Sequence, residues 1–311
     1  QEVPDPVPGP EEVVVEIVST GVNRAEVLQR MGRYPQPGPR ARHEIPGLEF
    51  AGVVIERGER AGAWNLGDEV MGITVGGGYA ERIAIHERQL SPVPSAVGVR
   101  DAGVIPEVWI TAWDALVLQG GLTPGATALV HAGGSGVGTA AIQIAKALGA
   151  NVIVTASAGK TAPCKALGAD RAVDYASEDF VEAVRELTGG RGVDVVLDVI
   201  GGEYLDRDLA ALAPRGRIVQ VGTMGQARAE INLGALMTKR ATLIGTVLRS
   251  RPIEEKIAVT QRFTREGLPW FERGVCRPVI DRRFTLDEIA EAHRVLEANA
   301  NVGKIAVDVR P

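Results

Sequence analysis

The first hundred residues carry short apolar runs separated by Gly and Pro, within which apolar and polar positions partly alternate. Such alternation is typical of half-buried β-strands. The segment therefore predicts a compact, mostly β domain. The runs expected as strands are Val13–Val18, Leu48–Glu56, Glu69–Ile73 and Tyr79–Ile85.

Between Thr127 and Thr246 the pattern changes to strands that alternate with helical periodicity, as in βαβ units. Six strands are expected, the number of a doubly wound parallel sheet with helices on both faces. The helix after the first strand has apolar residues three to four positions apart and stops at Gly149. The six runs are Thr127–His131, Val152–Ala156, Ala172–Tyr175, Asp194–Ile200, Arg217–Val221 and Thr242–Val247.

The end of the chain is expected to return to the first domain. Thr285 and Glu288 form a capping box ahead of an amphipathic helix, and the strand-like run Ile305–Val309 follows. We therefore predict an α/β protein of two domains. Residues 1–107 and 265–311 form the first, and residues 108–264 form the nucleotide-binding second.

The composition indicates that the protein's binding partner is a small molecule. The 34 basic and 39 acidic side chains give a net charge of −5 without basic runs, which argues against nucleic acid or an anionic membrane. Cys164 and Cys276 are too far apart for a CxxC motif, and no apolar stretch approaches 18 residues. The first ten residues lack a signal-peptide pattern, so we expect a soluble, cytoplasmic protein.

The segment TALVHAGGSGVGTAAIQIAKALGA, residues 127–150, is the most informative stretch. Its glycines, at 133, 134, 136 and 138, let the backbone turn sharply and bring a pyrophosphate against the N–H groups of a helix N-terminus. A glycine cluster alone also fits an ordinary turn. The strand before it, the helix after it and the further βα units favour a dinucleotide site.

The end of the second strand of that domain indicates which dinucleotide binds. An acidic residue there accepts from a ribose 2′-hydroxyl and repels a 2′-phosphate, and this chain has none. Ser157 and Lys160 instead offer a hydroxyl and an ammonium. Tyr175 follows the third strand and offers a phenol, although the neighbouring Asp174 would oppose a phosphate if it pointed inward. From position alone, Lys160 as a surface charge and Tyr175 as a packing residue are equally consistent. We predict NADPH over NADH.

Six motifs in order resemble the zinc-independent quinone oxidoreductases (zeta-crystallin-like) of the medium-chain dehydrogenase/reductase superfamily, nearest the stress-inducible quinone oxidoreductase subgroup. The resemblance covers nearly the whole chain. Its carriers are GVNRAEVLQRMGRYP (21–35), IPGLEFAGVV (45–54), GDEVMGITVGGGYAE (67–81), IPEVWITAWDAL (105–116), HAGGSGVGTAAIQ (131–143) and NVGKIAV (301–307).

The resemblance implies a GroES-like catalytic domain, a Rossmann NADPH-binding domain, and an active site in the cleft between them. It also implies a homodimer that pairs edge strands at 242–247. The family's AxxGxxG turn corresponds to Ala132, Ser135 and Gly138, with Val137 inside it. Lys160 and Tyr175 fall on positions that hold the 2′-phosphate, and Gly222 and Thr223 fall near the nicotinamide. The segments expected to close over the cofactor contain Leu248, Arg249, Asn301, Gly303 and Lys304.

Zinc-dependent relatives hold their metal with cysteine and histidine at places that here read Asn23 and Leu48. The four histidines, at 43, 86, 131 and 293, show no ligand spacing, so we expect no catalytic metal. Without a Lewis acid, alcohol oxidation is hard, whereas a quinone or enone accepts hydride directly. By resemblance, Asn23, Tyr34 and Thr111 line the cleft as donors to the developing oxyanion. Without the resemblance, a structural role as a cap, loop or turn residue is the favoured interpretation of each.

The leading hypothesis is an NADPH-dependent reductase of soluble quinones. An enoyl thioester or enone reductase uses the same hydride geometry and is the nearest alternative. A low-turnover NADPH-binding sensor or structural protein is the alternative from another class. No dedicated general base is recognisable, which leaves solvent or the cofactor ribose to deliver the proton.

Overall fold

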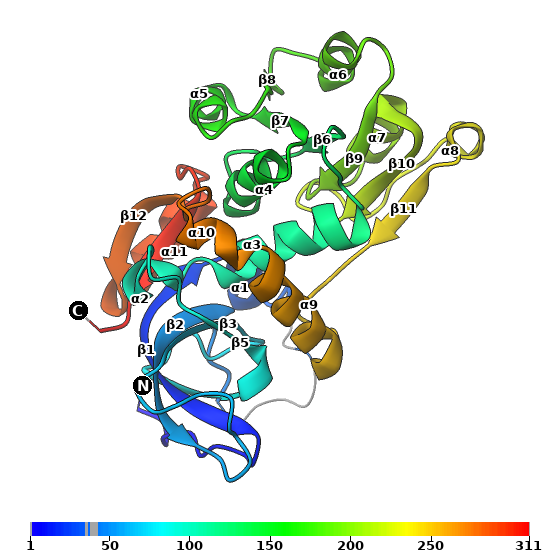
Figure 1. The fold of residues 1–311 in the computed structure, drawn as a ribbon. Helices are drawn as coiled ribbons and strands as arrows, with labels where there is room; N and C mark the ends of the chain where they lie inside the picture. Colours follow the sequence, from blue (N-terminus) through cyan, green and yellow to red (C-terminus); the bar gives the residue numbers. More distant parts are fainter. Residues whose placement is uncertain (1, 35–36, 38–42, 311) are drawn as a thin grey trace. The chain divides into compact units, whose positions relative to one another are not determined.

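The structure is a computed structural model that describes residues 2–34, 37 and 43–310. The chain forms two compact units (Figure 1). Unit 1 contains residues 1–110 and 248–311, and unit 2 contains residues 111–247. No helix in the described part of the chain combines the length and apolar character needed to cross a membrane.

Unit 2 is built on a parallel sheet whose strand order is β11-β10-β9-β6-β7-β8. Counted from β6, this is the order 3-2-1-4-5-6 of doubly wound dinucleotide-binding folds, as the sequence predicted. The strands are β6 (Thr127–Val130), β7 (Asn151–Ala156), β8 (Arg171–Asp174), β9 (Val193–Asp198), β10 (Leu212–Gln220) and β11 (Thr242–Gly245).

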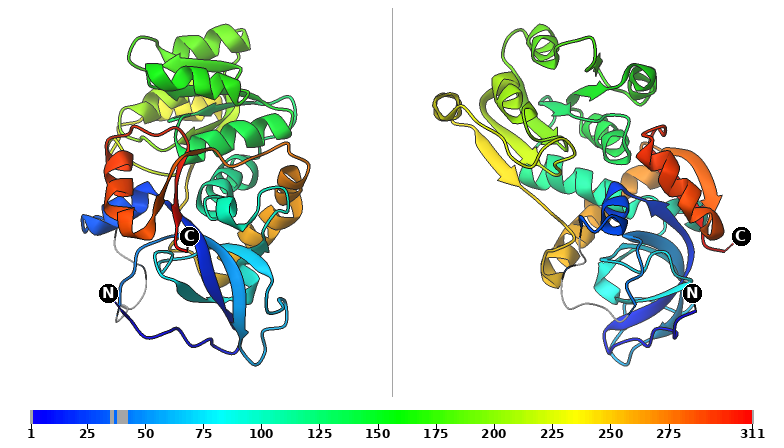
Figure 2. Two further views of the ribbon diagram at one scale, coloured as in Figure 1. Left: turned by 90° about the vertical axis from the view of Figure 1, so that its left-hand side faces the viewer. Right: turned by 180° about the vertical axis from the view of Figure 1, so that it is seen from behind.

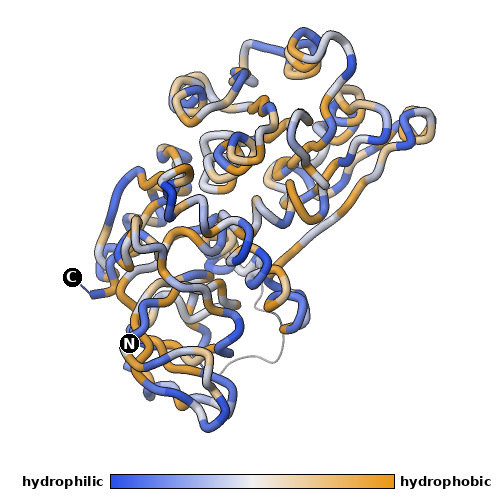
Figure 3. The backbone as a smooth tube through the Cα atoms, in the orientation of Figure 1, coloured by the Kyte–Doolittle hydropathy of each residue, from blue (hydrophilic) through white to orange (hydrophobic). Residues whose placement is uncertain are grey.

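Helices cover both faces of this sheet (Figures 1 and 2). Helices α4 and α5 pack on one face, and α6, α7 and α8 pack on the other. The central strands are runs of buried Val, Leu, Ile and Ala, as expected for strands covered on both sides (Figure 3). The segments are η2 (Asp114–Gln119, π-helical), α4 (Gly136–Ala147), α5 (Ala158–Ala166), α6 (Phe180–Thr188), α7 (Tyr204–Ala211) and α8 (Leu233–Lys239).

A buried polar pair joins the centre of this sheet to α7. His131 Nε2 lies 2.7 Å from Asp208 Oδ1, and His131 Nδ1 lies 2.9 Å from Thr155 Oγ1. Both residues of the pair are fully buried, and burial raises the pKa of Asp208. The rings of Phe180 and Tyr204 meet the imidazole edge-on. The pair therefore fixes the residue directly before the glycine turn.

The sheet of unit 1 runs β12-β13-β1-β2-β3-β5 in the described residues, with β4 pairing with β1 beside β13. Strands β12 and β13 are parallel, and the other pairs are antiparallel. Because β13 pairs with β1, the end of the chain does return to the first domain. The strands are β1 (Glu12–Val22), β2 (Glu49–Arg57), β3 (Glu69–Ile73), β4 (Arg82–His86), β5 (Leu90–Pro92), β12 (Ile280–Thr285) and β13 (Lys304–Asp308).

The helices of unit 1 surround this sheet, and α3 (Pro106–Trp113) begins in unit 1 and ends in unit 2. The expected capping box is present, because Glu288 Oε2 accepts from both Thr285 N and Thr285 Oγ1. The helical segments are α1 (Arg24–Arg30), η1 (Glu87–Gln89), α2 (Val99–Ala102), α9 (Ile253–Glu266), α10 (Leu268–Glu272), η3 (Leu286–Glu288) and α11 (Ile289–Glu297).

The second domain boundary differs from the one expected at residues 264 and 265. Residues 248–264 lie in unit 1, because α9 packs against η1, β5 and α10. Its buried face includes Ile257, Val259 and Phe263. The expected strand at 79–85 begins later, at Arg82, since Tyr79 and Ala80 form a turn. Strand β12 was not expected.

Gly52→Ala tests how tightly β1 and β2 approach in unit 1. A Cβ at Gly52 lies 2.1 Å from the carbonyl oxygen of Glu16, so the backbone of one strand must shift. We expect a loss of about 1–3 kcal/mol in the free energy of unfolding by urea. Gly62→Ala is the control, because no atom lies within 4 Å of its Cβ. Equal stability of the two variants contradicts the register described for β1 and β2.

Candidate active site

The glycine turn joins β6 to α4 at the carboxyl end of the unit 2 sheet. Ser135 caps α4, and its hydroxyl accepts from Gly138 N at 3.0 Å. A Cβ at Gly138 lies 2.3 Å from the carbonyl oxygen of Ala132, so only glycine lets the helix start this close to the turn. Ala132 itself has φ +56°, in the left-handed region. The small residues are thus required by the packing of the turn.

Three backbone N–H groups of the turn, those of Gly134, Gly136 and Val137, meet no acceptor among the described residues. The N–H of Gly133, in contrast, donates to the carbonyl of Thr155. Free N–H groups at a helix N-terminus bind anions, helped by the helix dipole. This part of unit 2 therefore fits the diphosphate of a dinucleotide.

Lys160 lies beside the turn, as its predicted role requires. A Cβ at Gly134 would meet Lys160 Cδ at 2.7 Å, which shows that the lysine stem runs along the turn. Lys160 is in the first turn of α5, and Ser157 is the N-cap of that helix. The Ser157 hydroxyl makes no capping hydrogen bond. A hydroxyl and an ammonium thus stand at the end of β7.

The carboxylate of Asp174 is turned into its own loop. Its oxygens accept from Ala176 N at 3.2 Å and Ser177 Oγ at 2.9 Å. These bonds occupy the charge that would otherwise oppose a phosphate. Tyr175, the next residue, is half exposed.

Gly222 and Thr223 follow β10 at the same carboxyl edge of the sheet. Gln220 Nε2 donates to the carbonyl of Gly222 at 2.7 Å and to that of Asp198, at the end of β9, at 3.3 Å. Thr223 is exposed. Gly222 and Thr223 therefore lie on the edge where doubly wound sheets bind ligands.

Lys304 is buried in unit 1, with only 4% of its surface exposed. Its ammonium donates to the carbonyl of Val22 at 3.0 Å and to Asn23 Oδ1 at 2.5 Å, and it pairs with Glu49 Oε1 at 2.7 Å. The resemblance implied that Lys304 lies in a segment that closes over the cofactor. In unit 1, its donors are committed to β1, α1 and β2.

Asn23 and Glu26 complete this buried network. Asn23 Nδ2 donates to Glu26 Oε1 and Glu49 Oε1 at 3.2 and 3.0 Å. Glu26 also accepts from Asn23 N, Leu48 N and Tyr79 OH. Burial raises the pKa of Glu26, and Lys304 opposes that rise. The amide of Asn23, expected to stabilise an oxyanion, is occupied on both sides within unit 1.

Arg249 is 7% exposed and is held by unit 1 on several sides. Its guanidinium donates to the carbonyls of Val75 and Tyr34 and to Gln29 Oε1, and it lies 4.9 Å from the centre of the Tyr34 ring. The Tyr34 hydroxyl has no partner among the described residues. Burial and the charge of Glu107 raise the pKa of Tyr34, so its phenol keeps its proton as a hydrogen-bond donor.

Asn301 and Gly303, which were also expected in a segment that closes over the cofactor, lie directly before β13. Asn301 Nδ2 donates to the carbonyl of Gly303 at 2.6 Å, and its buried Oδ1 has no partner in the described chain. Gly303 has φ +79°, and a Cβ there would lie 2.3 Å from the carbonyl oxygen of Val279. Thr111 is the first residue of unit 2, on α3, and is partly buried.

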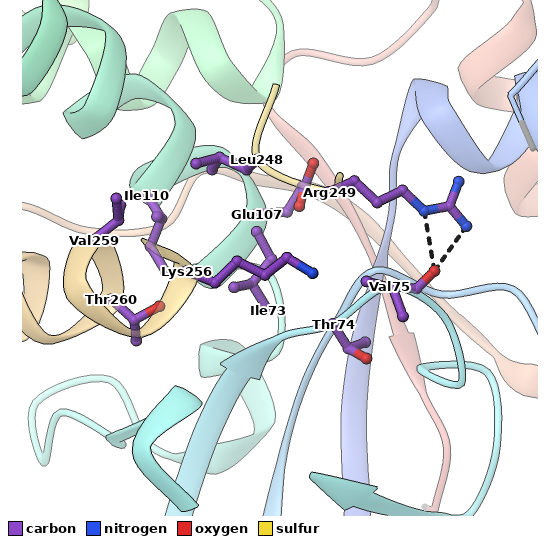
Figure 4. A pocket seen from close by; sticks show the side chains of 10 residues that line it. All are labelled: Ile73, Thr74, Val75, Glu107, Ile110, Leu248, Arg249, Lys256, Val259 and Thr260. Atoms are coloured by element: carbon purple, nitrogen blue, oxygen red, sulfur yellow. Dashed lines mark hydrogen bonds between the residues drawn. The ribbon is translucent and has the colours of Figure 1, made fainter. Parts of the chain in front are cut away.

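A small pocket in unit 1 brings Arg249 together with an acidic and a basic side chain, Glu107 and Lys256, that the sequence did not point to (Figure 4). Glu107 of α3, Lys256 of α9 and Arg249 reach it. Its free volume is about 10 Å³, roughly the room of one water molecule. The rest of the lining is largely apolar: Ile73, Thr74, Val75, Ile110, Leu248, Val259 and Thr260.

Glu107 is the most perturbed carboxyl of this pocket. Burial, then the negative charges of Glu49 and Glu26, raises its pKa to about 8, against the attraction of Lys304 and Arg249. Burial also lowers the pKa of Lys256, with Arg249 adding to that effect. The signal for Glu107 in the sequence was an acid inside the apolar run IPEVWITAWDAL, one helical turn before Thr111.

The donor set does not fit a zinc ion. Among the described residues, no three His, Cys, Asp or Glu side chains are grouped to hold a metal. Cys164 and Cys276 are both buried and free, and burial raises the pKa of each thiol. Asn23 and Leu48 supply neither a thiolate nor an imidazole.

Comparison with known proteins gives one consistent group. Residues 136–265 match the family described as zinc-binding dehydrogenase, and residues 9–95 match the alcohol dehydrogenase GroES-like domain. The chain is 32% identical over 308 residues to quinone oxidoreductase-like protein 2 of Bos taurus, covering 97% of this chain and 86% of that protein.

Solved structures agree with this grouping. A quinone oxidoreductase of Pseudomonas syringae superposes with a TM-score of 0.88 at 31% identity, covering 99% of this chain and 94% of that one. The JamJ enoyl reductase superposes with a TM-score of 0.88 at 26% identity, covering 99% and 94%.

Lys304→Met tests whether the buried ammonium of Lys304 stabilises unit 1. Removing it leaves Glu49 buried without its cation, and we expect a loss of about 3–5 kcal/mol in the free energy of urea unfolding. Glu49→Gln in the same chain should restore much of that loss, because no uncompensated charge remains. Unchanged stability of Lys304→Met, together with weaker dinucleotide binding, contradicts this assignment.

Proposed function

The chain belongs to the medium-chain dehydrogenase/reductase superfamily, and from this membership we propose that it reduces quinones with NADPH by direct hydride transfer without a metal. Membership makes the protein an oxidoreductase that uses a nicotinamide dinucleotide. The choice of NADPH, of quinones and of a metal-free reaction is our proposal.

The choice of NADPH rests on the side chains at the end of β7. No carboxylate stands there to accept from a ribose 2′-hydroxyl. The Ser157 hydroxyl and the ammonium of Lys160, whose stem runs along Gly134, suit a phosphate instead. The bonds of Asp174 within its own turn remove the nearest objection to a phosphate at this edge.

When bound, the reduced dinucleotide supplies a hydride. Residues of unit 2 bind and orient it: the free N–H groups of Gly134, Gly136 and Val137 take the diphosphate, Lys160 with Ser157 and Tyr175 takes the 2′-phosphate, and Gly222 and Thr223 stand where we propose the nicotinamide end. Because the cofactor is held by backbone groups of a rigid turn, its position costs little reorganisation.

The donors proposed for the acceptor's oxygen are the Tyr34 phenol and the Thr111 hydroxyl. Neither has a hydrogen-bond partner among the described residues, whereas the amide of Asn23 is already occupied by Lys304, Glu26 and Glu49. We therefore assign Asn23 to positioning. Uncharged donors suffice for an acceptor that already delocalises negative charge onto oxygen, and this supports quinones over alcohols.

We also propose a homodimer in the cytoplasm. Strand β11 is the edge of the unit 2 sheet, and its Leu243 is 42% exposed, as an edge that pairs with a second copy would be. Leu233 and Met237 of α8 add exposed apolar surface. The two cysteines are free and buried, which suits a reducing compartment.

An enoyl thioester or enone reductase is the second candidate, supported by the similarity to the JamJ enoyl reductase. Parallel assays of NADPH oxidation with a small soluble quinone and with an enoyl thioester separate the two. We expect turnover of the quinone. Turnover of the thioester alone rejects the quinone proposal in favour of the second. Tight NADPH binding with neither activity favours a low-turnover binding protein.

Lys160→Glu tests the cofactor choice. A carboxylate at this position repels the 2′-phosphate and removes a charge-assisted hydrogen bond, so we expect the KM for NADPH to rise about 10- to 100-fold. The KM for NADH should change little. Lys165→Glu, an exposed site in the last turn of α5, is the matched control for charge. An equal loss with both dinucleotides shows that Lys160 does not contact the 2′-phosphate.

A further inference from the structure

We propose that Glu107 is the proton donor to the reduced acceptor, a role that no residue of the sequence analysis filled. The inference rests on the proposed reductase function. It starts from an excess of carboxyl groups in unit 1, from the place of Glu107 in the wall of a pocket, and from its spacing to Thr111 on α3.

Three carboxyl groups are near one another in unit 1, those of Glu26 and Glu49 fully buried and that of Glu107 partly buried. The ammonium of Lys304 directly bridges only Glu49. Glu49 pairs with Lys304 and accepts from Asn23 Nδ2 and from the backbone N–H of Glu107 at 2.9 Å. Glu26 accepts from two backbone N–H groups, a phenol and an amide. The carboxyl of Glu107 receives no hydrogen bond in the described part of the chain.

Among the described residues, the cations that face Glu107 make no ion pair with its carboxyl group. Arg249, after β11, directs its donors to the carbonyls of Val75 and Tyr34 and to Gln29. Lys256, on α9, is partly desolvated in the same pocket. The other charged or titratable groups facing Glu107 are Glu49 of β2, Glu26 of α1, Lys304 of β13 and the phenol of Tyr34. Burial and the neighbouring carboxyl groups of Glu49 and Glu26 both favour the protonated form of Glu107.

The position of Glu107 suits delivery of that proton. It precedes Thr111 by four residues on α3, so the two side chains share one face of the helix. It also reaches the pocket together with Arg249, which holds Tyr34 (Figure 4). The proposed donors Tyr34 and Thr111 are thus the neighbours of Glu107 in space and along the helix. The pocket has about the volume of one water molecule.

The step balances without a further reactant. Hydride addition places two electrons and a hydrogen on the acceptor and leaves its oxygen with a negative charge. The O–H bond of Glu107 then breaks, a new O–H bond forms on the acceptor, and a carboxylate remains. That carboxylate takes one proton from solvent before the next turnover. The overall reaction consumes one NADPH and one solvent proton for each quinone reduced to hydroquinone.

The pH dependence follows from the protonation state of the donor. Because the pKa of Glu107 is about 8, the acid form dominates below that pH and falls tenfold per pH unit above it. The kcat of the natural chain should therefore decline above about pH 8. Glu107→Gln should lose about 10²-fold in kcat at pH 7, and this decline should be absent.

Matched variants identify the carboxyl as the cause. Glu255→Gln changes an exposed carboxyl of α9 and should leave both kcat and the pH profile unchanged. Glu107→Asp keeps an acid and should restore a declining limb above neutral pH. Profiles of Glu107→Gln that coincide with those of the natural chain overturn the inference while leaving the reductase function intact.

A second measurement needs neither cofactor nor substrate. In the unfolded chain Glu107 ionises near its ordinary value of 4.5, whereas the folded chain holds the proton until about pH 8. The stabilisation of the folded chain by this proton is therefore fully present below about pH 4.5. It is lost progressively as the pH rises to about 8. Relative to the natural chain, Glu107→Gln should gain tenfold per pH unit in its folding equilibrium constant over that window and gain nothing further above it.

Carboxyl NMR of the chain labelled with 13C at Glu should show one group titrating near pH 8, absent in Glu107→Gln. If every Glu titrates below pH 6 and the stability difference stays flat with pH, Glu107 does not hold a proton and the inference fails. If the NADPH assays show no reduction of any quinone or enone, the proposed function fails, and the titration separately shows whether Glu107 is an acid.

Discussion

The interior of unit 1 depends on one buried ammonium. Lys304 lies on the last strand, and its partners are the end of β1, the residue that caps α1, and a carboxylate on β2. Removing an ammonium and a carboxylate from water is costly, and it is offset only when each finds its partner in good geometry. The end of the chain therefore has to return to the first domain. The same geometry leaves Glu107, the third carboxyl of the group, without a cation of its own.

Unit 2 is governed by backbone geometry. The close approach of α4 to β6 excludes a side chain at Gly138, where a Cβ would lie 2.3 Å from the carbonyl oxygen of Ala132, and at Gly133, where a Cβ would lie 2.7 Å from Val154 Cβ. Packing and anion binding therefore require the same small residues. This explains why the glycine pattern and the flanking strand and helix were sufficient to predict a doubly wound parallel sheet from the sequence.

Interactions between distant residues were not accessible in the same way. Asn23 and Lys304 are separated by 281 positions, and each alone resembles a free polar group in a loop or strand end. In the folded chain the two side chains bind each other and their buried neighbours. These contacts compete with the oxyanion role expected for Asn23 and with the cofactor-closing role expected for Lys304. Arg249 likewise anchors two loops, through the carbonyls of Tyr34 and Val75. The helix at 253–266 has an amphipathic pattern that fits either domain, and only its packing against β5 and η1 assigns it to unit 1.

Without a metal, the proposed reductase has to balance the charge of its reaction with its own side chains. Hydride addition turns a neutral acceptor into an anion, and a site crowded with carboxylates would oppose that change unless one of them is kept neutral. Burial of Glu107 beside Glu49 and Glu26 achieves this, because their charges make loss of its proton unfavourable until an anion of higher basicity stands next to it. In the proposed mechanism, the repulsion that keeps Glu107 protonated also makes its carboxylate take a proton back from solvent after each transfer.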